Sequence, residues 1–320
     1  MLALTFVGRD DQRYLPFLIK RVMRIWPPFA VAIIASALLQ RFAPSGSSGP
    51  YSQWFYESWV VPPNIEVVAR HLDLTQLFVR PISELDSPMW SLVQEFRISL
   101  IFPTIVFFTL RRPFPSLISA VCLVFVAFLL IAGRHRELVS TVASTIGYVW
   151  LFVAGTVIAA KLDRVRALMR DLAPAWSAIL WFVGIGFLAF SESGVFASIQ
   201  QTVFILATGF GAMIVTSLCT VENRVTSVLE TAVPRWLGKV SYSLYLIHLP
   251  VLLAVFRLFA TNSFVQNAIL SVALALVAAE IMHLTVEVPS MAAGRKMARW
   301  VGRTTDLRNQ KATSTGRPSD

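Results

Sequence analysis

The stretch Ser87–Pro103, SPMWSLVQEFRISLIFP, decides the fold, because a polar loop turns here into an apolar helix that nevertheless carries Glu95 and Arg97. A charged side chain near the centre of a bilayer costs about 2.5–3.5 kcal/mol on insertion scales, so an ionisable group inside a membrane span is a functional-site hypothesis. The alternative is that one of the two side chains snorkels to the headgroups. We take Glu95 as a candidate site residue and leave Arg97 open.

The composition places the chain among membrane proteins. Of its 320 residues, 56% are hydrophobic and only 14% are charged, and the mean hydropathy is +0.65. Soluble domains are less apolar and close to 25% charged. The net charge of +10 comes from basic residues in short loops and one tail, and we find no nucleic-acid-binding pattern. Cys122 and Cys219 lie in apolar runs and imply no disulfide framework.

Apolar length predicts an all-α, polytopic helix bundle with about eight transmembrane helices. The fifth span is the shortest. The predicted spans are residues 25–42, 91–110, 115–133, 142–160, 175–190, 198–219, 239–260 and 265–287.

The distribution of basic residues predicts that both termini are cytoplasmic. Most of the 28 Lys and Arg residues fall in segments that such a topology places inside. The outer segments would hold only Arg41, Arg70, Arg80, Arg134 and Arg136.

Three segments outside the spans have recognisable patterns. Residues 14–25 read as an amphipathic entry segment that ends at the water boundary before Pro27-Pro28. The long outer loop 43–88 contains a helix-like segment, residues 65–78, and we expect the loop to lie on the membrane and cover part of the protein. Residues 301–320 are polar and are predicted to form a disordered cytoplasmic tail behind a membrane domain of residues 1–300.

Two stripes of polar residues lie within the last two spans. Ser241, Tyr245 and His248 are spaced i, i+4 and i+7, so they share a helix face that we expect to point into protein. A hydrogen-bonded structural histidine is as plausible here as a functional one.

Glu280, His283 and Glu287 form the second stripe. The Glu-x-x-His spacing occurs in di-iron bundles, but a second copy is missing, so we predict no metal site. A proton relay in a transporter is the better non-enzymatic reading.

Membrane depth links these residues. The topology places Arg21, Arg24 and Glu287 at the cytoplasmic edge, and Trp90 and Glu95 at the outer edge of their span. This arrangement suits a reaction or a transport step whose two partners approach from opposite faces.

Four ordered motifs resemble the signatures of the membrane acyltransferase 3 family, which includes O-antigen and peptidoglycan O-acetyltransferases. Each is weak alone, but their order across residues 21–289 is specific. They are Arg21-x-x-Arg24-Ile25-x-Pro27, Ser87-Pro88-Met89-Trp90-Ser91-Leu92-x-x-Glu95, Leu237-Gly238-x-x-Ser241-Tyr242-x-Leu244-Tyr245-Leu246-x-His248-x-Pro250 and Glu287-x-Pro289.

The resemblance implies a multi-pass enzyme of the inner (plasma) membrane. It would move an acyl group, commonly acetyl, from acyl-CoA to a hydroxyl of a carbohydrate or a lipid-linked cell-envelope glycan, with no bound cofactor. By this resemblance Arg21 and Arg24 would engage the acyl donor, Trp90 and Glu95 would shape the acceptor side, and His248 and Glu287 would support the membrane interior. We take Glu95 and His248 as candidate catalytic residues. The candidate substrate-binding residues are Arg21, Arg24, Trp90, Ser241, Tyr245 and Glu287.

The chain departs from the family pattern at its start. The family's first two helices, with the general-base histidine and a Phe-Phe-x-x-Ser-Gly-Phe run, have no counterpart here, and residues 1–7 fit a remnant of the second. Either the start codon is assigned too late, which we favour, or the chain is a degenerate, inactive copy. The alternative function is therefore a non-catalytic or transport-type membrane protein.

Overall fold

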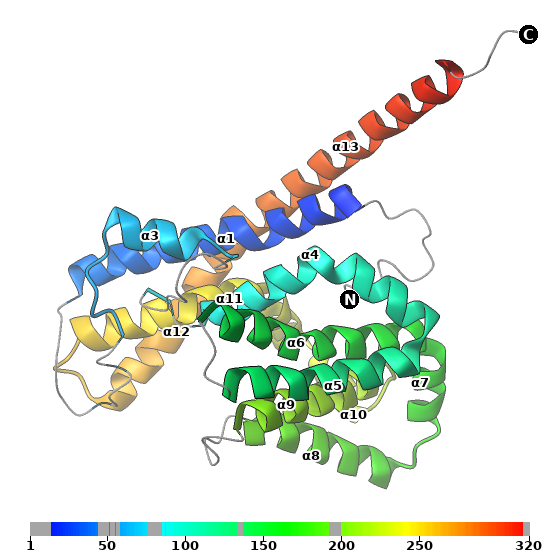
Figure 1. The fold of residues 1–320 in the computed structure, drawn as a ribbon. Helices are drawn as coiled ribbons and strands as arrows, with labels where there is room; N and C mark the ends of the chain where they lie inside the picture. The colour runs from blue at the N-terminus through cyan, green and yellow to red at the C-terminus, as the bar shows by residue number, and fades with distance from the viewer. Residues whose placement is uncertain are drawn as a thin grey trace, which may run out of the picture. The chain divides into compact units, whose positions relative to one another are not determined.

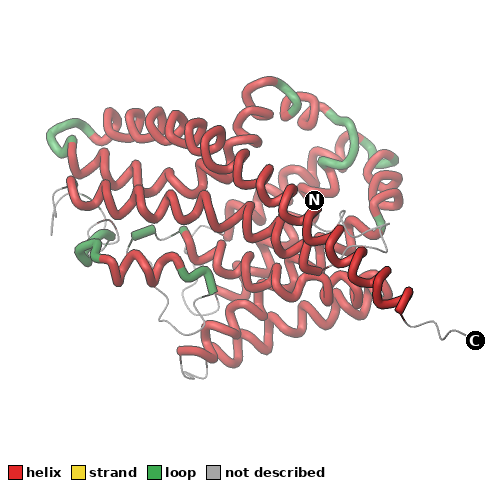
Figure 2. The backbone as a smooth tube through the Cα atoms, turned by 90° about the horizontal axis from the view of Figure 1, so that it is seen from above, coloured by secondary structure: helices red, strands yellow, loops and turns green. Residues whose placement is uncertain are grey.

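The computed structural model describes residues 14–43, 51, 55, 58–75, 85–86, 88–132, 137–191 and 200–315. These ranges contain helices and connecting turns but no strand (Figures 1 and 2). The main elements are α1 (Tyr14–Phe42), α3 (Ile65–Leu72), α4 (Met89–Arg111), α5 (Pro113–Ala132), α6 (Glu137–Ala160), α7 (Leu162–Arg170), α8 (Pro174–Ser191), α9 (Gln200–Leu218), α10 (Arg224–Leu229), α11 (Ala232–Leu258), α12 (Phe264–Met282), the π-helix η2 (His283–Glu287) and α13 (Val288–Thr315).

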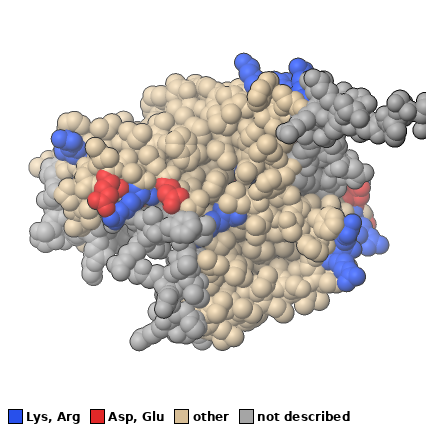
Figure 3. Space-filling view, turned by 45° about the horizontal axis from the view of Figure 1, so that its top comes forward, with Lys and Arg blue, Asp and Glu red and all other residues tan. Residues whose placement is uncertain are grey.

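Within the described residues, each of the eight predicted apolar segments is mainly helical. Six described helices are long and apolar enough to cross a membrane. The apolar parts of α8 and α9, Pro174–Ala189 and Val203–Leu218, are shorter. The protein is thus a multi-pass membrane helix bundle, while the count of eight spans and the cytoplasmic termini stay predictions. Large apolar side chains such as Phe114 and Phe182 are 72% and 82% exposed, as a lipid-facing surface requires. The face drawn in Figure 3 is mostly uncharged, with charged residues in a few small groups.

The helices divide into two compact units, with the boundary inside α4 between Phe96 and Arg97. The unit of residues 97–235 is built on the pairs α5 with α6 and α8 with α9. Trp150 of α6 is buried, donates a hydrogen bond to the carbonyl of Ile205 (3.0 Å) and lies against Gly209, where a Cβ atom would be 2.0 Å from the indole. The absence of a side chain at Gly209 therefore lets α9 approach α6.

In the second unit, residues 12–96 and 236–320, α1 packs beside α13 (Figure 1). The predicted entry segment of residues 14–25 and the predicted span of residues 25–42 form one helix, because α1 continues through Pro27 and Pro28. Two missing N–H groups weaken this turn. The carbonyls that lose a donor are those of Met23 and Arg24, and the Tyr242 hydroxyl donates to the neighbouring carbonyl of Ile25 (2.9 Å), which ties this turn to α11.

The loop that follows α1 contains a buried anchor, Trp59. This residue has a positive φ of 58°, which is unfavourable for a bulky side chain. Its indole N–H donates to the carbonyl of Leu85 (3.0 Å), and the Gln40 amide of α1 donates to the Trp59 carbonyl (2.8 Å). The expectation that the loop covers part of the protein agrees with these contacts.

The helix predicted in this loop is confirmed as α3 as far as Leu72 and packs on α1, whereas Phe78 lies outside the described residues. Its buried His71 bonds the Val67 carbonyl through Nδ1 (2.7 Å) and accepts from the amide of Leu85 through Nε2 (3.2 Å). His71 thereby ties α3 to the segment that precedes α4.

The C-terminal helix is longer than the sequence suggested. α12 continues through the π-helix η2 into α13, which extends to Thr315, although we expected disorder from residue 301. Residues 316–320 lie outside the described part of the chain.

Candidate functional site

An ion pair joins two of the predicted site residues. Arg21 of α1 donates through Nη2 to Oε1 of Glu95 on α4, and the Arg21 side chain is 9% exposed while that of Glu95 is 36% exposed. The prediction that these residues lie at opposite membrane edges is therefore wrong. Arg21 lies about 10 Å along α1 from Tyr14, because the presumed entry segment is part of the span.

The other arginine of the Arg-x-x-Arg motif, Arg24, differs from Arg21 in both exposure and pairing. Arg24 is exposed, and within the described residues its guanidinium has no hydrogen-bond or ion-pair partner. A guanidinium group presents several donors in a planar fork that matches phosphate oxygens. The motif thus combines a buried, paired cation with one that is available to an anion.

The face of α4 that carries Glu95 also carries Ser91, one turn earlier. Ser91 Oγ lies 2.6 Å from the Tyr245 hydroxyl of α11, which in turn donates to the carbonyl of Pro88. Since the Tyr245 hydrogen is used at Pro88, the Ser91 hydroxyl donates to Tyr245. Trp90, also predicted for the site, is 46% exposed.

His248 of α11 is oriented by its own helix. Its Nδ1 lies 2.8 Å from the carbonyl oxygen of Tyr245 and 3.2 Å from that of Leu244. Because a carbonyl only accepts, Nδ1 carries the hydrogen, and Nε2 of the neutral ring keeps a lone pair. Ser241 is exposed and donates to the carbonyl of Gly238 (3.0 Å), so the expectation that the whole face points into protein is not met at Ser241.

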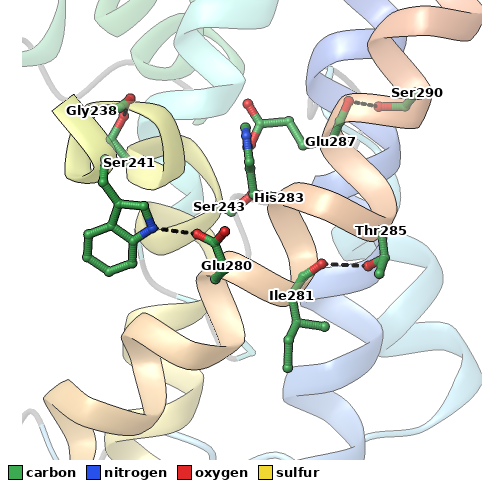
Figure 4. Close-up of polar contacts among 10 residues, drawn as sticks. Gly238, Ser241, Ser243, Glu280, Ile281, His283, Thr285, Glu287 and Ser290 are labelled. Atoms are coloured by element: carbon green, nitrogen blue, oxygen red, sulfur yellow. Dashed lines mark hydrogen bonds and ion pairs between the residues drawn. The ribbon is translucent and has the colours of Figure 1, made fainter. Parts of the chain in front are cut away.

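The second polar stripe splits into two groups (Figure 4). Glu280 accepts from the Trp236 indole (2.7 Å), whereas Glu287 accepts from Ser243 Oγ (2.8 Å) and lies 2.9 Å from Nδ1 of His283. The π-helical turn between residues 283 and 287 shifts the register after Glu280. Only Glu287, 4% exposed, is deeply buried.

No metal centre is visible in the part of the chain that the structure describes. Its His, Cys, Asp and Glu side chains nowhere gather in a group of three that could hold an ion. The donors that do approach one another are better suited to hydrogen bonding than to coordination.

Sequence reasoning missed Asp86, which directly precedes the Ser-Pro-Met-Trp motif outside the spans. Its side chain is 1% exposed, and among the residues that the structure describes neither carboxyl oxygen has a hydrogen-bond partner. Burial raises its pKa from 3.8 to about 8. A carboxyl group that lacks compensation in this way stays protonated near neutral pH.

Arg97, left open by the sequence, is not in this site. It is 7% exposed, lies in the other unit and donates to Thr145 Oγ1 (3.1 Å).

Tyr242, whose hydroxyl donates to the Ile25 carbonyl of α1, was part of a family motif but was not predicted as a site residue. Its place beside Tyr245 on α11 was the available signal.

Together, helices α1, α4 and α11 present an accessible cation, a carboxylate, an exposed indole and an imidazole lone pair. These groups could bind an anionic donor, stack on a sugar ring and accept a proton from a hydroxyl.

The comparisons with known proteins agree with this chemistry. The family model described as an acyltransferase domain matches residues 2–281 and thus covers most of the chain. Glu287 lies beyond the matched range. Comparison with curated proteins and with solved structures returned no match. The family match confirms the resemblance seen in the motifs, and the chain belongs to the acyltransferase 3 family of membrane acyltransferases.

Proposed function

We propose that this protein is an O-acyltransferase of the inner (plasma) membrane that moves an acyl group, most simply acetyl, from acyl-CoA to a hydroxyl of a carbohydrate or cell-envelope glycan. The observation that carries the proposal is the ion pair between Arg21 and Glu95, since it joins the Arg-x-x-Arg helix to the Trp90–Glu95 helix. The family match supports acyl transfer in general. The donor and acceptor are our inference.

We assign the binding of the acyl donor to Arg24. Coenzyme A carries phosphate groups, and the exposed Arg24 guanidinium, which has no partner among the described residues, can form charge-assisted hydrogen bonds with them. Arg21 is buried and its Nη2 already pairs with Glu95, so we assign it to holding α1 against α4.

We assign to His248 the role of accepting the proton of the acceptor hydroxyl. In the proposed step the acceptor hydroxyl oxygen bonds to the thioester carbonyl carbon, the C–S bond breaks, and the hydroxyl proton passes to Nε2. The protonated ring then returns that proton to the thiolate of CoA. The Nδ1 hydrogen bonds to α11 hold the ring in the tautomer that leaves Nε2 free to accept.

The acceptor side combines an aromatic platform with an apolar cavity. Trp90 is exposed enough to stack on a sugar, and Glu95, which is partly exposed, can accept hydrogen bonds from its hydroxyls. A cavity of about 710 Å³, lined by aromatic residues such as Phe55, Phe256 and Phe264, lies at the junction of α11 and α12. Such a cavity could hold the lipid of a lipid-linked glycan.

The alternative is a non-catalytic or transport-type protein. The observation that favours it is the hydrogen-bonded group of Ser243, Glu287 and His283, which lies between apolar helices and resembles a proton relay. Proton-coupled transport would require these side chains to pass protons across the membrane.

The test measures the transfer of a labelled acetyl group to a glycan. Purified protein, with any in-frame upstream helices included, would be incubated with radiolabelled acetyl-CoA and a lipid-linked glycan, beside the variants His248→Ala and Lys239→Ala. We expect label in the glycan with the wild type and the exposed control Lys239→Ala, and at least a hundredfold less with His248→Ala. An unlabelled glycan with every form would reject the enzyme and leave the transport alternative.

A further inference from the structure

A second polar cavity lies in the unit of residues 97–235, among α7, the start of α8 and the turn between α9 and α10. Its volume is about 920 Å³. Three arginines line it, Arg166 and Arg170 from α7 and Arg224 from α10, together with one acidic residue, Glu222. The acyl-transfer proposal uses none of these residues.

The positive charges in this cavity are not compensated. Arg166 and Arg170 are spaced i, i+4 and share a face of α7. Within the described ranges, none of the three guanidinium groups has a hydrogen-bond or ion-pair partner, and Glu222 pairs with none of them. Three cations facing one carboxylate favour an anion, and guanidinium groups bind phosphate in bidentate fashion.

Trp181 of α8 also lines the cavity and is 9% exposed. Within the described residues its Nε1 has no hydrogen-bond partner, but this nitrogen is itself buried and is not shown to face the cavity. The nature of the ligand is therefore inferred from the arginines.

The surroundings are those of a membrane interface. α7 is short, buries no residue and alternates basic with apolar side chains. Leu168 on α7 and Trp176 at the start of α8 are 63% and 61% exposed, and the cavity itself is lined in part by the apolar side chains of Met169, Leu172 and Val225. Aromatic and apolar residues next to basic ones are typical of the headgroup region, where basic pockets between helices bind anionic lipids.

We propose that this cavity binds the phosphate of an anionic phospholipid headgroup through Arg166, Arg170 and Arg224, with the acyl chains leaving the cavity along Met169, Leu172 and Val225. The ligand chemistry is a phosphate mono- or diester. The apolar flank favours a lipid over a soluble phosphate.

The test compares two double variants of one helix. Full-length protein in mixed micelles with equal phosphatidylglycerol and phosphatidylcholine would be analysed by native mass spectrometry, with Arg166→Gln/Arg170→Gln beside Lys161→Gln/Arg164→Gln. Both remove two positive charges, the first from α7 and the second from α7 and its N-cap residue Lys161, but Lys161 and Arg164 do not line the cavity. We expect a preference for phosphatidylglycerol that falls on the order of tenfold only in the cavity variant.

Two further arms identify the ligand and control for folding. Arg224→Gln should weaken the preference and the exposed Arg235→Gln should not, while thermal unfolding checks that each variant is folded. Equal loss in both double variants would overturn the site in favour of diffuse attraction, as would no preference in the wild type. Displacement of the lipid by millimolar inorganic phosphate or by coenzyme A would overturn the lipid assignment.

Discussion

Arg21 and Glu95 form an ion pair although they are 74 positions apart in the chain, one on α1 and the other on α4. The pair fixes these helices within one unit and fixes the relative depth of the two motifs in the membrane. A buried guanidinium needs such a partner, because removing one member of a buried pair leaves an uncompensated charge.

Glu95→Gln should therefore destabilise the protein. We expect a loss of about 1–3 kcal/mol, less than for a fully buried pair because Glu95 is partly exposed. Thermal unfolding in detergent measures it, and Glu66→Gln, which removes the exposed ion pair with Arg70, is the matched control. Equal small effects in both variants would contradict a structural role for the pair between Arg21 and Glu95.

Arg24→Ala should weaken donor binding without loss of stability. Removal of one charge-assisted hydrogen bond costs about 1.5–3 kcal/mol, which corresponds to roughly a tenfold to hundredfold rise in the Kd for acetyl-CoA. Lys20→Ala removes an exposed cation one turn earlier on α1 and should leave the Kd unchanged. Calorimetric titration of both variants with acetyl-CoA measures the Kd. An unchanged Kd for Arg24→Ala would show that this residue does not bind the donor.

The sequence predicted the helical segments well, because apolar length determines which stretches of chain can cross a bilayer. It also selected Arg21, Glu95 and Tyr245, which the structure connects through α1, α4 and α11. The contact between Arg21 and Glu95 could not be predicted. It depends on α1 continuing through Pro27-Pro28, and the bond from Tyr242 that supports this turn comes from a residue more than 200 positions later.

Other features depend on burial, which spacing alone does not reveal. Asp86 looks like an ordinary loop carboxylate in the sequence, yet packing leaves it without a hydrogen-bond partner. The π-helical turn at residues 283–287 separates Glu280 from Glu287, although a regular helix would align them.

Asp86 should make the protein less stable as the pH rises. Its pKa is about 8 when folded and 3.8 when unfolded, so the folded state holds the extra proton between these values. Stability is complete at low pH and falls from about pH 4 to about pH 8. Asp86→Asn removes this term, and its melting temperature relative to the wild type should therefore rise between pH 5 and pH 8.

The control for this pH dependence is Asp163→Asn, which changes an exposed carboxylate on α7. The difference in melting temperature between Asp163→Asn and the wild type should not vary with pH. If the Asp86→Asn and wild-type melting temperatures run parallel from pH 5 to pH 8, the buried carboxyl does not titrate as described.

Gly209 should be the most sensitive glycine of the unit formed by residues 97–235. A Cβ there would lie 2.0 Å from Cζ2 of Trp150, a ring fixed by its hydrogen bond to Ile205, so Gly209→Ala must push α9 away from α6. Overpacking of this kind costs about 1–3 kcal/mol. Gly186 on α8 has no heavy atom within 4 Å of its Cβ position, so Gly186→Ala should be neutral or stabilise by about 0.5–1 kcal/mol through helix propensity. Melting temperatures of the two variants in detergent should move in opposite directions, and a common decrease would show that the close approach of α9 to Trp150 is not what limits this position.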